Sequence, residues 1–152
     1  MKKQLDQTRE FNTTAGIDLP SSLTFPTRKR ISLCISLIQE EMGEILEAYN
    51  NLDKVEVIDG LADLQYVVNG LINAFGADEL MEEAFHLVHE SNMSKFCKTE
   101  EEATATIEDY KKKGIDTHAV LNGDLFVVRR NSDNKILKNI NYKPVDLKKI
   151  VK

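Results

Sequence analysis

The chain has 152 residues, 41% hydrophobic and 30% charged, with a formal net charge of −5. This length suits one domain with a sizeable core, and the acidic balance argues against a broad nucleic-acid-binding surface. The basic N-terminus has no apolar stretch behind it, and no run approaches the roughly 18 apolar residues of a membrane span. We therefore expect a cytoplasmic protein that binds neither nucleic acid nor membrane. The spacing of the two cysteines, Cys34 and Cys97, predicts reduced thiols rather than disulfides or a zinc site.

The first half of the chain has the pattern of helices. Residues 3–13 suit a short helix, and Thr27 suits the N-cap of a long helix over residues 28–50. A second long helix, apolar on most of its circumference, is expected over residues 55–75, with Gly76 as its C-cap. The apolar residues of the first long helix recur at spacings of three and four: they are Ile31, Cys34, Ile35, Ile38, Met42, Ile45 and Tyr49.

Two further helices are expected before the sequence changes character. One covers residues 79–95, with Asp78 as a candidate cap. The next begins at Thr99, which forms a capping-box pattern with Glu102. Gly114 can close its far end, so the helical part of the chain ends there.

The last part of the chain has the pattern of short strands. Residues 118–121 and 124–130 flank Asn122 and Gly123, which predicts a hairpin with a type I′ turn. Residues 135–140 are expected to form a third strand. The predicted fold class is mainly all-α, a bundle of four or five helices with a small C-terminal antiparallel β element.

Three carboxylates gather on one side of the first long helix. Glu40 and Glu44 are four residues apart and project from one face, and Glu41 lies about a quarter turn to the side. Leu33 and Leu37 occupy the same sector in earlier turns, so this face is apolar where it is not acidic. The alternative interpretation is a solvated helix face, but such a face is more often polar along its whole length.

The second long helix repeats the pattern. Glu56 and Asp59 are three residues apart and Asp63 follows four later. The same sector continues with Val67, Gly70 and Ala74. Grouped, uncompensated carboxylates are costly to bury and are normally neutralised by cations or protons. Mg²⁺ prefers carboxylate and water oxygens and bridges them to phosphates, whereas zinc prefers nitrogen or sulfur. We therefore expect a magnesium site.

The stretches QEEMGE and EVIDGLADLQYVVNG resemble the EExxE and ExxD motifs of the all-α NTP pyrophosphatases. This MazG-like superfamily includes phosphoribosyl-ATP pyrophosphohydrolases and helical dUTPases. HESNMSKF and the C-terminal tail resemble segments of small MazG-like proteins of phages and bacteria. The resemblance implies a MazG-like bundle over residues 1–114, with residues 115–152 as a β extension of the same domain.

The resemblance implies an enzyme that uses Mg²⁺, with Mn²⁺ as a substitute, to cleave between the α and β phosphates of a nucleotide. The products are a nucleoside monophosphate and pyrophosphate, as in housecleaning of the nucleotide pool. Glu41 is then the residue that orients or deprotonates water. Which of Asp59 and Asp63 is the closer ligand stays open, because in some relatives the Asp of ExxD immediately precedes a Leu-Leu-Tyr-like stretch. That register would put Asp63 at the Asp position and Gly60 where Glu belongs. The implied metal ligands are Glu40, Glu41, Glu44, Glu56 and Asp59, with Asp63 as the alternative to Asp59.

Asn92 and Lys95, one turn apart, are the candidate substrate-binding residues, because they can offer a hydrogen bond and a positive charge to phosphate or sugar. The apolar circumference of the helix over residues 55–75 predicts a homodimer or homotetramer, which the resemblance also implies.

Two other functions compete with a pyrophosphohydrolase. In the first, the apolar helices form a non-enzymatic oligomeric interaction module whose acidic patches bind a basic partner. In the second, Glu83 and His86, with His89 three residues further on, belong to a di-iron helical bundle. That fold needs two Glu-x-x-His elements, and the chain supplies one.

Overall fold

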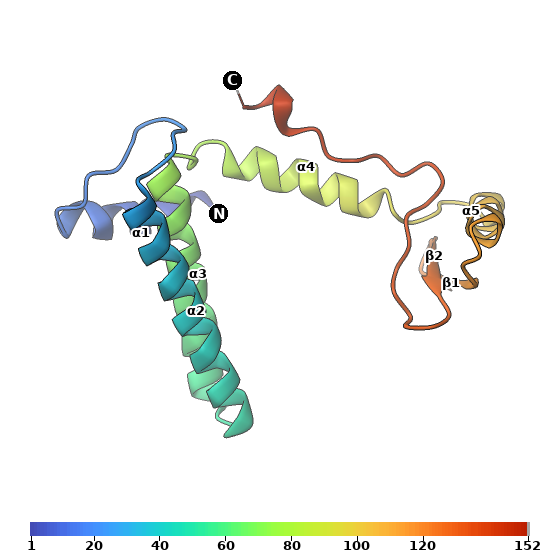
Figure 1. Cartoon of the computed structure of the whole chain (residues 1–152), viewed down its shortest axis with the longest axis horizontal. Coiled ribbons are helices and arrows are strands. Elements are labelled where there is room, and N and C mark those ends of the chain that lie inside the picture. Colours follow the sequence, from blue (N-terminus) through green and yellow to red (C-terminus); the bar gives the residue numbers. More distant parts are fainter. Residues whose placement is uncertain (152) are drawn as a thin grey trace. The chain divides into compact units, whose positions relative to one another are not determined.

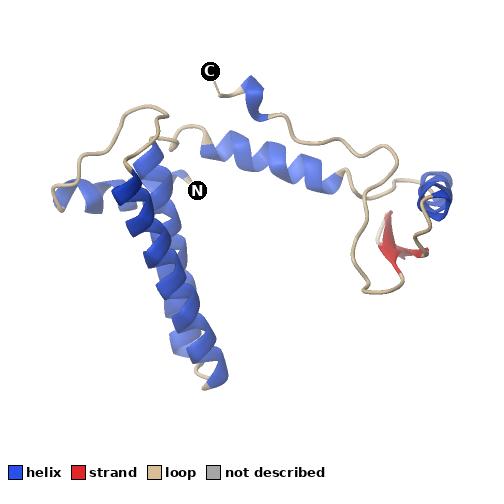
Figure 2. Cartoon of the chain, in the orientation of Figure 1, coloured by secondary structure: helices blue, strands red, loops and turns tan. Residues whose placement is uncertain are grey.

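The computed structural model describes residues 1–151 as five helices, one two-stranded sheet and a short 3₁₀ turn, Leu147–Lys149 (Figures 1 and 2). The mainly all-α class with a C-terminal hairpin is therefore confirmed. The chain forms two compact units, Met1–Glu82 and Glu83–Lys152. Within the described part of the chain, no helix has both the length and the apolar character that a membrane crossing requires.

The first unit is built on a helical hairpin. Helix α2, Arg28–Asn50, and helix α3, Lys54–Phe75, pack along each other (Figure 1). The hydroxyl of Thr27 caps α2 by accepting from the backbone N–H of Arg30 at 3.3 Å. Gly76 ends α3 in the left-handed conformation, at φ 63°. Both predicted caps are confirmed, because each rests on local backbone geometry.

Only part of the apolar surface of α2 packs against α3. Its least exposed residues follow one stripe: Ile31, Cys34, Ile38, Glu41, Ile45 and Ala48. Ile35, Met42 and Tyr49 were expected in the stripe, but their exposed fractions are 42%, 58% and 67%. That expectation was wrong for these three residues, since all three lie along one flank of the packed stripe and one partner helix covers only part of an apolar circumference.

Helix α1, Lys2–Thr14, packs against α3 through a partly polar interface. Leu5, Thr8 and Asn12 are the buried residues of α1. Asp78 was expected to cap the following helix, but its carboxylate accepts instead from Arg9, at 3.0 Å and 2.8 Å, and from Asn73. The cap prediction was wrong because a guanidinium brought close by the fold competes for the same oxygens.

The second unit contains the remaining helices, although α4, Met81–Met93, begins at its boundary. Helix α5, Glu100–Lys112, is capped by Thr99, which accepts from the Glu102 N–H at 3.2 Å. The Glu102 carboxylate reaches back by one residue more than a capping box requires, to the Lys98 N–H at 2.7 Å.

The sheet of the second unit is a hairpin with a shifted turn. Strand β1, Thr117–Asn122, pairs with β2, Leu125–Arg130, in antiparallel register. Because Asn122 pairs with Leu125, the two loop residues are Gly123 and Asp124. Gly123 has φ 61° and Asp124 is not among the positive-φ residues, as a type II′ turn requires. The predicted type I′ turn at Asn122 and Gly123 was wrong by one position.

The expected third strand over residues 135–140 does not form. Ile136 makes a single bridge with Arg129, and the Leu137 N–H donates to Val128 O at 2.9 Å. The chain then leaves the sheet, because the Asn139 N–H donates to Lys95 O at 3.1 Å.

Candidate active site on helices α2 and α3

Six carboxylates of the hairpin occupy neighbouring turns of its two helices. Those on α2 are Glu40, Glu41 and Glu44, and those on α3 are Glu56, Asp59 and Asp63. Glu44 and Glu56 line one hollow of about 380 Å³, together with Glu47, Ala48, Asn51 and Asp53. Asp53 also caps α3, by accepting from the N–H groups of Val55 and Glu56. The tight turn between the helices therefore brings one residue of each predicted cluster into a shared acidic hollow.

Glu41 is the carboxylate that lies on the packed stripe of α2. Its Oε2 atom is buried and has no hydrogen-bond partner. Burial raises the pKa of Glu41 above its usual value of 4.5, and the negative charges of Glu44, Asp63, Glu40 and Asp59 raise it further. Such an atom is costly without a compensating group, since it has lost water and gained no donor.

Both candidate clusters act electrostatically on this one side chain. Asp63 has a larger effect on the pKa of Glu41 than Asp59 has, although both raise it. Asp59 and Asp63 are therefore near enough to Glu41 for their charges to act on it together with those of Glu40 and Glu44. The choice between Asp59 and Asp63 as the closer metal ligand stays open.

None of the five ion pairs within residues 1–151 involves these six carboxylates. In the same residues, no three Asp, Glu, His or Cys side chains are already grouped as a metal site. The chemistry of the donors nevertheless fits a hard divalent cation, because all six offer carboxylate oxygens. The buried Oε2 of Glu41, which accepts no hydrogen bond, fits it as well.

Asn92 and Lys95 lie in the second unit, at the end of α4 and just beyond it. The Lys95 ammonium donates to the Asn92 Oδ1 atom at 2.7 Å. The structure thus brings these two candidate substrate residues together with each other. His86 is exposed and lies 3.4 Å from Glu90, as expected of a surface histidine.

The residues around Asn92 bind the C-terminal tail, a role that sequence reasoning missed. Ser91 donates to Lys143 O at 2.9 Å, and Ser94 accepts from the Lys143 N–H at 3.0 Å. Asn139 donates to Phe96 O at 3.0 Å. The recurrence of serine and asparagine beside the motif was the available signal, because buried polar side chains need partners.

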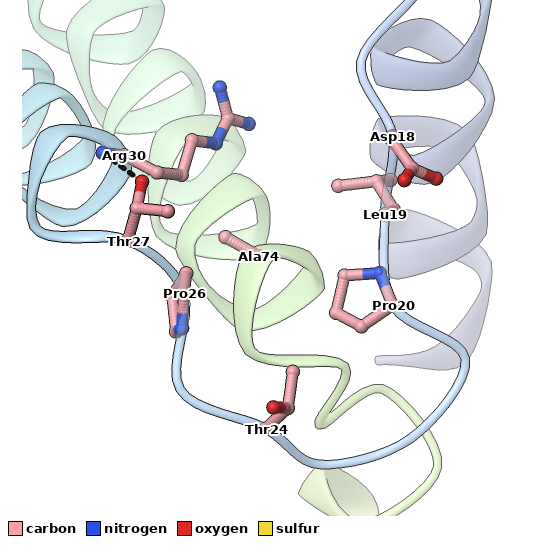
Figure 3. Close-up of a pocket in the computed structure, with 8 residues that line it drawn as sticks. All are labelled: Asp18, Leu19, Pro20, Thr24, Pro26, Thr27, Arg30 and Ala74. Atoms are coloured by element: carbon pink, nitrogen blue, oxygen red, sulfur yellow. Dashed lines mark hydrogen bonds between the residues drawn. The ribbon is translucent and has the colours of Figure 1, made fainter.

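A second hollow of about 350 Å³ lies at the start of α2, away from the acidic turn (Figure 3). Its lining is mixed: Asp18, Leu19, Pro20, Thr24, Pro26, Thr27, Arg30 and Ala74. The Arg30 guanidinium also donates to Asn12 Oδ1 at 3.3 Å, so it links α2 to α1. This contact gives Arg30 a packing role between the two helices.

A comparison with known families identifies the class of protein. A family model described as phosphoribosyl-ATP pyrophosphohydrolase (PRA-PH) matches residues 8–92, a stretch that contains all six carboxylates. The match defines the class of protein as the MazG-like all-α NTP pyrophosphatase superfamily. The chain belongs to the PRA-PH family, which is a family of pyrophosphohydrolases.

A viral protein is also similar to this chain. It is the "Uncharacterized protein L479" of Acanthamoeba polyphaga mimivirus, which is 31% identical over 135 residues. The alignment covers 80% of this chain and 52% of the viral protein. The chain therefore spans about half the length of this curated relative.

Proposed function

We propose that the protein is a Mg²⁺-dependent nucleoside triphosphate pyrophosphohydrolase. It cleaves the bond between the α and β phosphates and releases a nucleoside monophosphate and pyrophosphate. The observation that carries the proposal is the buried Oε2 of Glu41, which has no partner and lies among the carboxylates of both helices. Family membership supports the class of reaction.

The six carboxylates would hold the cation or cations: Glu40, Glu41, Glu44, Glu56, Asp59 and Asp63. When bound, Mg²⁺ supplies charge neutralisation of the triphosphate and activation of water. Glu41 is suited to orient that water or accept its proton, because burial and its acidic neighbours raise its pKa and so make it a stronger base than an ordinary glutamate. Asn92 and Lys95, in the second unit, stay predicted substrate-binding residues.

We also propose a homodimer or homotetramer. Large apolar side chains of both hairpin helices are exposed, among them Leu46, Ile58 and Leu61, whose exposed fractions are 60%, 67% and 49%. A monomer rarely leaves large apolar side chains exposed along both helices of a hairpin. A second copy of the chain would cover it, as in most symmetric oligomers.

The test is a substrate screen with purified protein. The common ribonucleoside and deoxynucleoside triphosphates, together with phosphoribosyl-ATP, are incubated with Mg²⁺ or Mn²⁺, and monophosphate and pyrophosphate are quantified. At least one compound should give both products in equal amounts, and EDTA should abolish the reaction. Release of inorganic phosphate in place of pyrophosphate would contradict the proposed bond. No hydrolysis of any compound would favour the interaction module instead.

A further inference from the structure

Gly60 is a buried glycine in the interior of α3, where neither a turn nor a helix end explains it. Glycine inside a helix is unfavourable relative to alanine, because it loses more backbone freedom on folding. A glycine in such a place therefore calls for a reason outside its own helix.

The reason is the approach of α2. A Cβ atom at position 60 would lie 2.8 Å from Cγ1 of Ile45, and 3.6 Å and 3.7 Å from the backbone N and Cα of the same residue. Real Cβ atoms essentially never come within 3.0 Å of such a neighbour, so either Ile45 or the helix would have to move. The two helices are close here because Gly60 has no side chain.

Other helical glycines of this unit do not have such a neighbour. A Cβ at Gly43, on α2, would have nothing within 4 Å. A Cβ at Gly70, ten residues further along α3, would make only ordinary contacts at 3.9 Å with Asn12 and Thr8. The close approach is therefore specific to the contact between Gly60 and Ile45.

The position of this contact relates it to the candidate site. Gly60 directly follows Asp59 and precedes Asp63 by three residues, whereas Ile45 directly follows Glu44. This tight contact between the helices thus lies next to carboxylates of both α2 and α3. A change in helix separation at this point moves the two groups relative to each other.

We propose that Gly60 is a positioning residue that, through Ile45, sets the separation of the two carboxylate clusters and hence the affinity of the site for a divalent cation. The inference rests on the proposed function for the identity of the site. It concerns the spacing of the helices and assigns Gly60 no contact with substrate or metal.

The experiment measures Mn²⁺ binding by electron paramagnetic resonance and by calorimetry. Wild type is compared with Gly60→Ala and with the matched control Gly70→Ala. Two further variants are the single substitution Ile45→Ala and the double variant Gly60→Ala/Ile45→Ala. We expect Gly60→Ala to weaken Mn²⁺ binding by about 10-fold or more, the range seen when groups that support metal ligands are lost. Gly70→Ala should bind as wild type does. The double variant should recover most of the loss, since Cγ1 of Ile45 is gone.

Circular dichroism shows whether each variant is folded. If Gly60→Ala does not fold, Ile45→Phe replaces it, because a larger side chain opposite an intact Gly60 also separates the helices and should weaken Mn²⁺ binding. A folded Gly60→Ala variant with wild-type affinity overturns the inference, as does a double variant that binds no better than Gly60→Ala. Wild type that binds Mn²⁺ but hydrolyses no nucleotide overturns the proposed function instead, and leaves the spacing result standing.

Discussion

At the scale of single residues, Glu41 is the position where the proposed catalysis and the stability of the fold oppose each other. One oxygen of its carboxyl is buried, and its pKa is raised, first by burial and then by four acidic neighbours. Folding therefore favours the protonated form over the charged form. The charged form of Glu41 therefore lowers the free energy of unfolding. This loss is absent below the ordinary pKa of 4.5 and is complete once the pH exceeds the raised value.

We expect Glu41→Gln to lower pyrophosphohydrolase activity by roughly 100-fold or more, as the loss of a general base does. The same substitution should stabilise the metal-free protein at pH 7 by about 1 kcal/mol, the size of a typical single-residue effect. Activity assays and thermal melts between pH 4 and pH 8 check both parts, and the gain in stability should vanish toward pH 4.

The matched control is Glu10→Gln, which removes an exposed carboxylate from α1 of the same unit. Neither its activity nor its melting temperature should differ measurably from those of wild type. A Glu41→Gln protein that is fully active would contradict the role of Glu41. If the stability of Glu41→Gln relative to wild type were lower at pH 7 than at pH 4, the electrostatic penalty assigned to Glu41 would be contradicted.

Asp78 shows the opposite shift. Burial alone would raise its pKa, but hydrogen bonds from Arg9 and Asn73 and the Arg9 charge hold the pKa below the ordinary 3.8. The resulting stabilisation is present above pH 3.8 and is lost as the pH falls through the lowered pKa. Asp78→Asn should therefore destabilise the protein by about 2 kcal/mol at pH 7, as expected for hydrogen bonds to a charged group.

Urea unfolding at a series of pH values measures this loss. The difference between wild type and Asp78→Asn should begin to shrink below pH 3.8, where the carboxyl of the unfolded chain takes up its proton. It should be smallest below the lowered pKa, where the carboxyl of the folded protein is protonated as well. Asp18→Asn, at an exposed position of the same unit, provides the control with the same change of charge. A pH-independent difference would show that packing, and not charge, accounts for the effect.

At the scale of elements, the C-terminal tail is held in the second unit by polar side chains. Asn139 is 6% exposed, donates to Phe96 O at 3.0 Å and accepts from the Asn141 N–H at 3.0 Å. Asn139→Ala leaves these buried groups without partners. The substitution should lower the free energy of unfolding by about 2 kcal/mol, within the range for an unsatisfied buried polar group.

Chemical denaturation followed by far-UV circular dichroism gives this free energy of unfolding. Asn141→Ala is the control, because this exposed side chain makes only a 3.3 Å hydrogen bond to Glu102, and its cost should stay within about 0.5 kcal/mol. Equal costs for the two substitutions would contradict the anchoring role of Asn139.

The helices were predictable because their signals are local. The caps Thr27 and Gly76 and the period of apolar residues located α2 and the end of α3. The buried face of α2 was not predictable, since Ile35 and Met42 are as apolar as Ile38 and the sequence does not state how much of the helix its partner covers. Similarly, Gly123 predicted a tight turn, but the pairing across the strands decided its position.

For the candidate site, spacing alone predicted which carboxylates share a helix face. It did not predict that Glu41, rather than Glu40 or Glu44, lies on the packed stripe. That depends on the contact of α2 with α3 near Gly60, which no local pattern encodes. The partner of Asp78 was missed for the same reason, because Arg9 is 69 residues away in the sequence.

At the scale of the whole molecule, the exposed apolar surface of the hairpin predicts association. Replacing Leu46 or Ile58 by glutamate should shift an oligomer toward monomer, because a charge buried in an interface is costly. Light scattering coupled to size-exclusion chromatography measures the mass. Leu121→Glu is the control, since it introduces the same charge at a side chain that is 59% exposed on the β hairpin.

A monomeric wild-type protein at micromolar concentration would contradict the proposed assembly. If both hairpin variants kept the wild-type mass, the interface would have to lie elsewhere. Activity should fall together with mass if the assembled hairpins complete the substrate site.

The two cysteines have a practical consequence that goes beyond their redox state. Cys34 is 4% exposed and Cys97 is fully buried, and each of the two compact units contains one of them. A thiol reagent can reach either sulfur only when the surrounding structure opens. Pulse labelling followed by peptide mass analysis would therefore time the opening of each unit separately in the natural sequence, with Cys34 reporting on the helical hairpin and Cys97 on the hairpin and tail of the second unit.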